Sequence, residues 1–251
     1  MITLLRRICQ FLIIYFLGLF FLMGIKYSLG LSNYVIPGIS EIYGVFVSEY
    51  RRYFSDVVST LSVAVIGQAL SICLALLVGI MGRQATWFGS FVRVAAYNIQ
   101  AYPIVAIAPI IFILLGDGFL SRLIIAAMIC YFPLLLSVVG IMAEPVKDIE
   151  HFYRVTGRMR WQLEVKIRAF ENLGKLTTVI SGSATLAMAG TIVAEFIAAN
   201  AGIGYSIRIA LYQSDLARVL VALFLIGIIL SVYQGLLEWA GSLVKEKWAG
   251  G

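Results

Sequence analysis

Residues 120–142 read LSRLIIAAMICYFPLLLSVVGIM, with Arg122 as the one charged side chain in a long apolar run. A helix needs about 20 apolar residues to cross about 30 Å of hydrocarbon. Several other runs in the 251-residue chain are similar, and 61% of all residues are hydrophobic against 13% charged. A soluble domain carries roughly 25% charged residues. The sequence therefore predicts an all-α membrane protein that crosses the bilayer several times.

We predict one transmembrane domain over residues 1–251 with six helices and two polar loops, at residues 26–56 and 143–175. The first span is expected to stay uncleaved, because no small-x-small site follows its apolar run. Placing both termini in the cytoplasm puts most of the 19 Lys and Arg inside, as the positive-inside rule requires. The predicted spans are approximately residues 8–24, 57–81, 91–115, 120–142, 176–198 and 219–243.

The composition argues against several other classes of function. A net charge of +6 in a membrane chain reports orientation, so nucleic acid is not implied as a partner. Three cysteines lie in apolar runs without pairing or metal-ligand spacing, and His151 is the one histidine. An HExxH zinc site and a Ser/His/Asp triad built on a second histidine are excluded. We expect no catalytic, metal or cofactor site on this chain.

Polar residues inside the spans are costly in lipid unless they face protein or water. Small and hydroxylated residues also serve helix packing, so packing and a transport pathway both remain open for each of them. Pro103 and Pro109 interrupt the third span and would free backbone carbonyls beside its polar residues. The candidate pathway-lining residues are Tyr97, Asn98, Gln100 and Tyr102 in the third span, and Ser181, Ser183, Thr185 and Thr191 in the fifth.

The stretch GRMRWQLEVKIRAFENLGK (residues 157–175) is basic and amphipathic in an otherwise apolar chain. Apolar residues recur there at helical spacing, and Gly157 is expected to divide the segment into two short helices. Such a stripe fits either an anionic lipid surface or a soluble partner on the cytoplasmic side. The residues proposed for this contact are Phe152, Val155, Gly157, Arg158, Met159, Arg160, Leu163 and Ile167.

Four segments carry a resemblance to a known family. Gly157 and Ile167 match the cytoplasmic loop signature of permease subunits of binding-protein-dependent ABC importers, although His151-Phe152-Tyr153 stand where Glu-Ala-Ala is usual and Ala169-Phe170 where Leu-Pro is usual. The flanking segments YPIVAIAPIIFILLGDG (102–118), VAEFIAANAGIGYSIRIA (193–210) and YVIPGISEIYGVF (34–46) are similar to the sulfonate, taurine and nitrate branch. The resemblance covers roughly residues 34–248.

This resemblance implies a type I importer permease fold in the bacterial inner membrane and a pathway built from two permease subunits, either a homodimer or a pair with a close paralogue. It also implies a separate ATPase dimer that holds ATP and Mg, and an external substrate-binding protein. The 143–175 loop would contain the coupling helix. The solute would be an organic sulfonate, a nitrate-like anion or a vitamin precursor. The chain has no GxxxxGK[ST] phosphate loop, which agrees with hydrolysis on a partner.

The end of the fifth span predicts an outer gate. Glu195 is its one charged residue, and Gly202 and Gly204 permit a tight reversal just after it. We expect this reversal to contact the binding protein, with Glu195 held by a partner such as Arg208. Two other functions fit the sequence less well. An intramembrane enzyme would need convergent acid–base groups within the spans, and the sequence does not offer them. The second is an ATP-independent transporter or channel. Proton-coupled transport would need charge pairs at the midplane, and these are also missing from the sequence.

Overall fold

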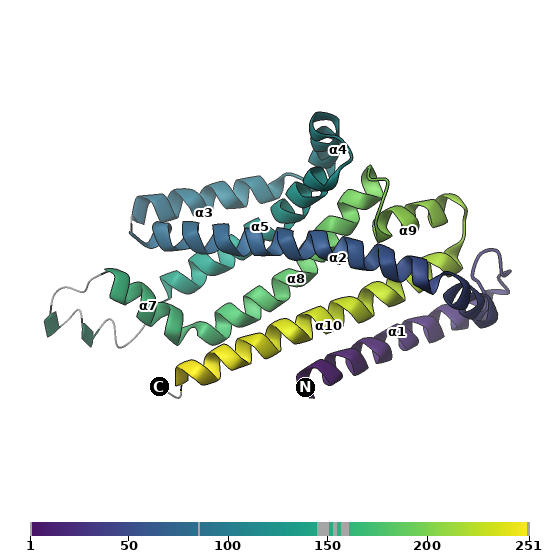
Figure 1. Ribbon diagram of the computed structural model, residues 1–251, viewed down its shortest axis with the longest axis horizontal. Helices are drawn as coiled ribbons and strands as arrows, with labels where there is room; N and C mark the ends of the chain where they lie inside the picture. The colour runs from purple at the N-terminus through teal and green to yellow at the C-terminus, as the bar shows by residue number, and fades with distance from the viewer. Residues whose placement is uncertain (1, 85, 145–150, 153–154, 157–160, 250–251) are drawn as a thin grey trace.

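The computed structural model describes residues 2–84, 86–144, 151–152, 155–156 and 161–249. Helices joined by short connections make up this described part of the chain, and no strand occurs in it (Figure 1). The all-α membrane fold is therefore confirmed. The helices are α1 (Ile2–Leu29), α2 (Ile39–Gln84), α3 (Thr86–Ala101), α4 (Ile104–Leu115), α5 (Phe119–Ala143), α7 (Trp161–Glu171), α8 (Leu173–Ile197), α9 (Ile203–Tyr212) and α10 (Leu216–Ala249).

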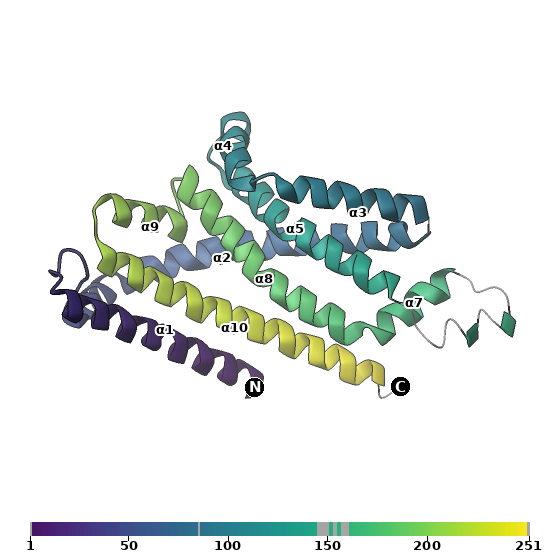
Figure 2. The ribbon, with the colours of Figure 1, turned by 180° about the vertical axis from the view of Figure 1, so that it is seen from behind.

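Helix α8 is central in the bundle. It packs against α2, α5 and α10, and in Figure 2 it crosses in front of α2 with α5 and α10 on either side. Small residues permit this close packing. A Cβ atom on Gly190 of α8 would lie 3.0 Å from the Ala126 Cα atom of α5, and one on Gly67 of α2 would lie 3.2 Å from the Ala126 Cβ atom. The three helices therefore meet almost backbone to backbone around Ala126.

Helix α1 lies at the edge of the bundle and packs on α10 (Figure 1). Gly227 of α10 forms the notch for it, since a Cβ atom there would lie 1.9 Å from Phe11. Large apolar side chains cover the rest of α1, and Phe20 and Ile14 are 78% and 69% exposed. A surface of this composition is suited to lipid.

The third predicted span is a broken helix. Among the described residues, five helices are long and apolar enough to cross a membrane, and α3 with α4 would be a sixth, although the pair is bent by 86°. Pro103 causes the break, because proline lacks an N–H group and forces Tyr102 before it out of the α conformation. The interruption predicted at Pro103 is therefore a sharp bend between two helices, whereas Pro109 lies inside α4 without ending it.

The two polar segments differ in how much of them is helical. The loop predicted at residues 26–56 is mostly helical, because α1 continues to Leu29 and α2 already begins at Ile39. A helix break precedes the fifth span, although Ala169-Phe170 stand there in place of the usual Leu-Pro. Asn172 separates α7 from α8, and its side-chain amide donates to the Arg168 carbonyl at 3.1 Å.

Candidate functional site

One face of α8 is not covered by the rest of the chain. It lies opposite α2, towards the viewer in Figure 2. Its exposed positions are three or four residues apart, so they form one stripe along the helix. The residues are small or hydroxylated, in contrast to the large apolar side chains of α1. We call them the open face of α8: Gly174, Thr178, Gly182, Thr185 and Ala189.

A buried carboxylate closes the outer end of α8. Glu195 is fully buried, and its Oε1 atom lies 3.3 Å from the Arg122 guanidinium at the start of α5. The Oε2 atom lies 2.8 Å from the Thr60 hydroxyl of α2 and accepts the Gly204 N–H of α9 at 3.0 Å. One side chain thus joins α8 to α2, α5 and α9. Thr60, Arg122, Glu195 and Gly204 are called the Glu195 cluster below.

The Glu195 cluster also explains how α9 begins. The first N–H groups of a helix have no partner inside the helix and carry partial positive charge. Here the Ile203 N–H donates to Thr60 Oγ1 at 2.9 Å, and the Gly204 N–H donates to the carboxylate. Gly202 just before them has φ +92°, and a Cβ atom on it would lie 2.1 Å from Glu195 Oε1. Glycine is therefore required at this turn.

Arg208 is not the partner of Glu195, contrary to the sequence-based expectation. Its guanidinium donates to the carbonyl groups of Phe196 at 3.1 Å and Ala199 at 2.8 Å, at the C-terminal end of α8. A cation there satisfies free carbonyls and complements the helix dipole. The Ser206 hydroxyl of α9 donates to Asp56 of α2 at 2.7 Å. Helix α9 is therefore fastened at several points.

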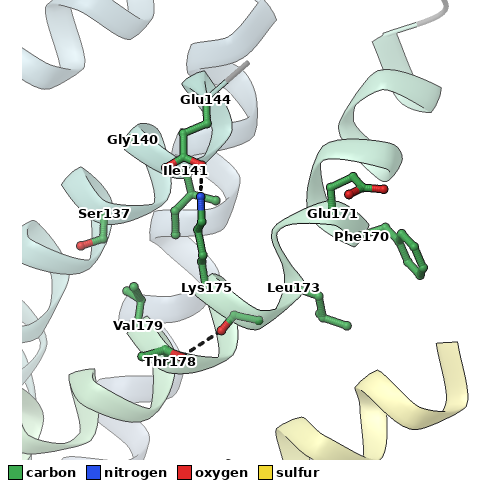
Figure 3. A pocket seen from close by; sticks show the side chains of 11 residues that line it. Ser137, Gly140, Ile141, Glu144, Phe170, Glu171, Leu173, Lys175, Thr178 and Val179 are labelled. Atoms are coloured by element: carbon green, nitrogen blue, oxygen red, sulfur yellow. Dashed lines mark hydrogen bonds and ion pairs between the residues drawn. The ribbon is translucent and has the colours of Figure 1, made fainter. Parts of the chain in front are cut away.

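A pocket of about 900 Å³ lies at the opposite, cytoplasmic end of the open face, between α5, α7 and α8 (Figure 3). Gly174 and Thr178 line it, so it continues directly from the open face. Lys175 points across it and forms an ion pair with Glu144, as the dashed line in Figure 3 marks. Arg168 of α7 donates to the Glu144 carbonyl. The end of α5 is thus tied to both α7 and α8.

The residues predicted to line a pathway separate into two groups. Ser181, Ser183 and Thr191 are buried between helices, where the Ser183 hydroxyl accepts from Gln68 of α2 at 2.9 Å. Thr185 is exposed on the open face. The third-span residues Tyr97, Asn98, Gln100 and Tyr102 are all exposed around the break between α3 and α4.

The residues proposed to contact a cytoplasmic partner are only partly described. Phe152 and Val155 are exposed, by 39% and 72%, and Ile167 is half-buried on α7. Gly157, Arg158, Met159 and Arg160 lie outside the described residues, and so does the side chain of Leu163.

Reasoning from the sequence missed Thr60, Arg122 and the Glu144–Lys175 pair. Arg122 had a usable signal: it is the only charge in its apolar run, as Glu195 is in the fifth span. Isolated charges of opposite sign on two spans predict a pair, because each is costly alone. Thr60 had no such signal among the many hydroxyls of α2.

The fold is that of a polytopic membrane protein. The open face of α8 runs along it from the Glu195 cluster to the pocket between α5, α7 and α8. Residues 71–245 match the family of binding-protein-dependent transport system inner membrane components, and the chain belongs to that family. It is an integral protein of the inner membrane.

Two relatives of the chain are named as transport permeases. The chain is 38% identical over 143 residues to the riboflavin transport system permease protein RibX of Chloroflexus aurantiacus, a match covering 55% of this chain and 53% of that protein. It is 25% identical over 181 residues to the formylaminopyrimidine transport permease protein ThiX of Halalkalibacterium halodurans, covering 70% of this chain and 71% of that protein. The match therefore spans about half the length of RibX.

Proposed function

We propose that two copies of this chain form the pathway of an ATP-driven importer, with their open faces of α8 turned towards each other. The observation that carries the proposal is the open face itself. A helix face of Gly, Thr and Ala is poorly suited to lipid, and it leads from the Glu195 cluster to a cytoplasmic pocket. An external binding protein delivers the solute, and a separate ATPase dimer drives the cycle.

The solute is proposed to be a planar nitrogen heterocycle of the vitamin or vitamin-precursor type. Both named relatives belong to transport systems for such compounds. The open face offers little to an anion, because its own five residues are uncharged and the neighbouring Lys175 is paired with Glu144. Organic sulfonates and nitrate fit this surface less well.

Uptake into vesicles tests this proposal. The permease is reconstituted with its ATPase and binding protein. Uptake of radiolabelled riboflavin, formylaminopyrimidine and taurine is measured with and without ATP on the side of the membrane that carries the ATPase. We expect ATP-dependent uptake of a heterocycle and little uptake of taurine. Equal uptake without ATP would make the protein a secondary transporter or channel, and preference for taurine would overturn the substrate class.

Helix α9 is proposed to be the outer gate that responds to the binding protein. Glu195→Gln keeps the size of the side chain but weakens its hold on Arg122 and on the start of α9. We expect the variant to lower ATP hydrolysis stimulated by the loaded binding protein more than it lowers basal hydrolysis. The ratio of the two rates in nanodiscs is the measurement, and an unchanged ratio would show that the gate lies elsewhere.

A further inference from the structure

Arg7 of α1 has a defined hydrogen-bonding position far from its neighbours in sequence. Its Nε and Nη2 atoms donate to the two carboxylate oxygens of Glu238 on α10, with the Nε bond at 2.8 Å. Its Nη1 atom donates to Gln234 Oε1 at 2.7 Å. A guanidinium group can donate hydrogen bonds but cannot accept them. The oxygen of the Gln234 amide must therefore face Arg7, and its nitrogen must face the other way.

The orientation of the Gln234 amide fixes the role of the next group. Its Nε2 atom donates to the hydroxyl oxygen of Thr185 on α8. The hydroxyl accepts in this bond, so its own hydrogen is left to donate elsewhere. Within the part of the chain that the structure describes, Gln234 is the one hydrogen-bond partner of the Thr185 hydroxyl.

Other hydroxyls on α8 are used differently. Thr178 and Thr191 donate to the carbonyl groups four residues earlier in the helix, Gly174 and Ala187, both at 2.9 Å. Ser183 donates to the Ile180 carbonyl at 2.8 Å while it accepts from Gln68. These hydrogens are therefore occupied by the helix backbone. Thr185 differs because Gln234 holds it as an acceptor on the open face, about 18 Å from either end of α8.

We propose that Thr185 is a specificity-determining residue that donates a hydrogen bond to the passing solute, and that Arg7 and Gln234 are positioning residues that hold it as a donor. The inference rests on the proposed function, since it requires the open face to line the pathway. The ligand chemistry is a solute with a carbonyl or ring-nitrogen acceptor. Riboflavin and formylaminopyrimidine both present such atoms.

Four variants in the uptake assay test the donor role. Thr185→Val removes the hydroxyl at nearly constant volume, and Thr185→Ser is the matched control that retains it. Gln234→Glu reverses the arrangement, because a carboxylate accepts from Thr185 and still pairs with Arg7. Gln234→Glu combined with Thr185→Val should be no worse than either single change. The probes are riboflavin, formylaminopyrimidine and taurine at concentrations well below saturation.

We expect Thr185→Val and Gln234→Glu each to lower uptake roughly 3- to 10-fold, the size of one lost hydrogen bond, with Thr185→Ser close to wild type. A purely structural role predicts the opposite for Gln234→Glu, which would strengthen the contact with Arg7 and leave uptake unchanged. Unchanged uptake with either single variant overturns the proposal.

A labelling experiment separates this inference from the proposed function. In a background without Cys9, Cys73 and Cys130, the variant Thr185→Cys should react with a membrane-impermeant thiol reagent, whereas Leu17→Cys on the lipid-facing side of α1 should not. Absence of reaction at residue 185 overturns the inference, whichever solute is carried. Reaction at residue 185 without uptake of any of the three solutes overturns the proposed substrate class and supports a water-facing Thr185.

Discussion

Arg122→Met is expected to destabilise the protein by about 3 to 5 kcal/mol, because it leaves the Glu195 carboxylate buried without its cation. Glu195 has no exposed surface, and the Arg122 side chain is only 12% exposed. The other two groups on the carboxylate, Thr60 and the Gly204 N–H, are uncharged donors. They cannot replace the lost charge.

Thermal unfolding in detergent measures this loss, which corresponds to a fall in Tm of roughly 6 to 20 °C for a chain of this size. Arg52→Met is the matched control, because Arg52 lies 3.7 Å from Glu49 with a side chain 60% exposed. Exposed pairs contribute about 0 to 1 kcal/mol. Adding Glu195→Gln to Arg122→Met should recover most of the loss. Equal Tm values for the Arg122 and Arg52 variants would contradict a charge-pairing role for the Glu195 cluster.

Val155→Glu is expected to lower transport roughly 100-fold or more, because it places a charge on the apolar stripe proposed to bind the ATPase. Val155 is 72% exposed in the single chain, an unusual position for a large apolar side chain on the cytoplasmic side. Membrane insertion should be unaffected, since the residue lies outside the spans.

Co-purification of the ATPase with the tagged permease is the direct measurement for this variant. Val155→Leu is the matched control, because it keeps the stripe apolar and should retain the partner. Normal association of the ATPase with Val155→Glu would show that Val155 does not contact the ATPase. The docking surface would then have to lie at other residues.

The spans could be predicted from the sequence because length and hydropathy alone decide whether a helix can cross a membrane. An interruption of the third span at Pro103 and Pro109 was predicted, but only Pro103 lies at a break between helices, and Pro109 lies inside α4. Proline is tolerated within membrane helices when neighbours satisfy the freed groups, as Pro133 is inside α5. Whether a proline bends a helix or breaks it depends on packing that the local sequence does not contain.

The candidate site was harder to predict for the same reason. Arg208 was expected to pair with Glu195 because it is near in the chain, whereas Arg122 is 73 residues away. Arg7 was counted only as a sign of orientation, yet it holds Gln234 and Glu238 more than 220 positions later. Partners of buried polar groups are selected by the contacts between helices, and these follow from the whole fold.

The distance along the chain between Arg122 and Glu195 also sets an order in time for biosynthesis. Ribosomes add about 5 to 20 residues per second, so Arg122 enters the membrane about 4 to 15 s before its carboxylate is made. During that interval the guanidinium has to reach up to the headgroups, which its place at the outer start of α5 permits. Helix α9 is made after α8, and only then can its first N–H groups meet the carboxylate. The outer end of the bundle is therefore expected to be completed late in synthesis, after most of the membrane-embedded core has formed.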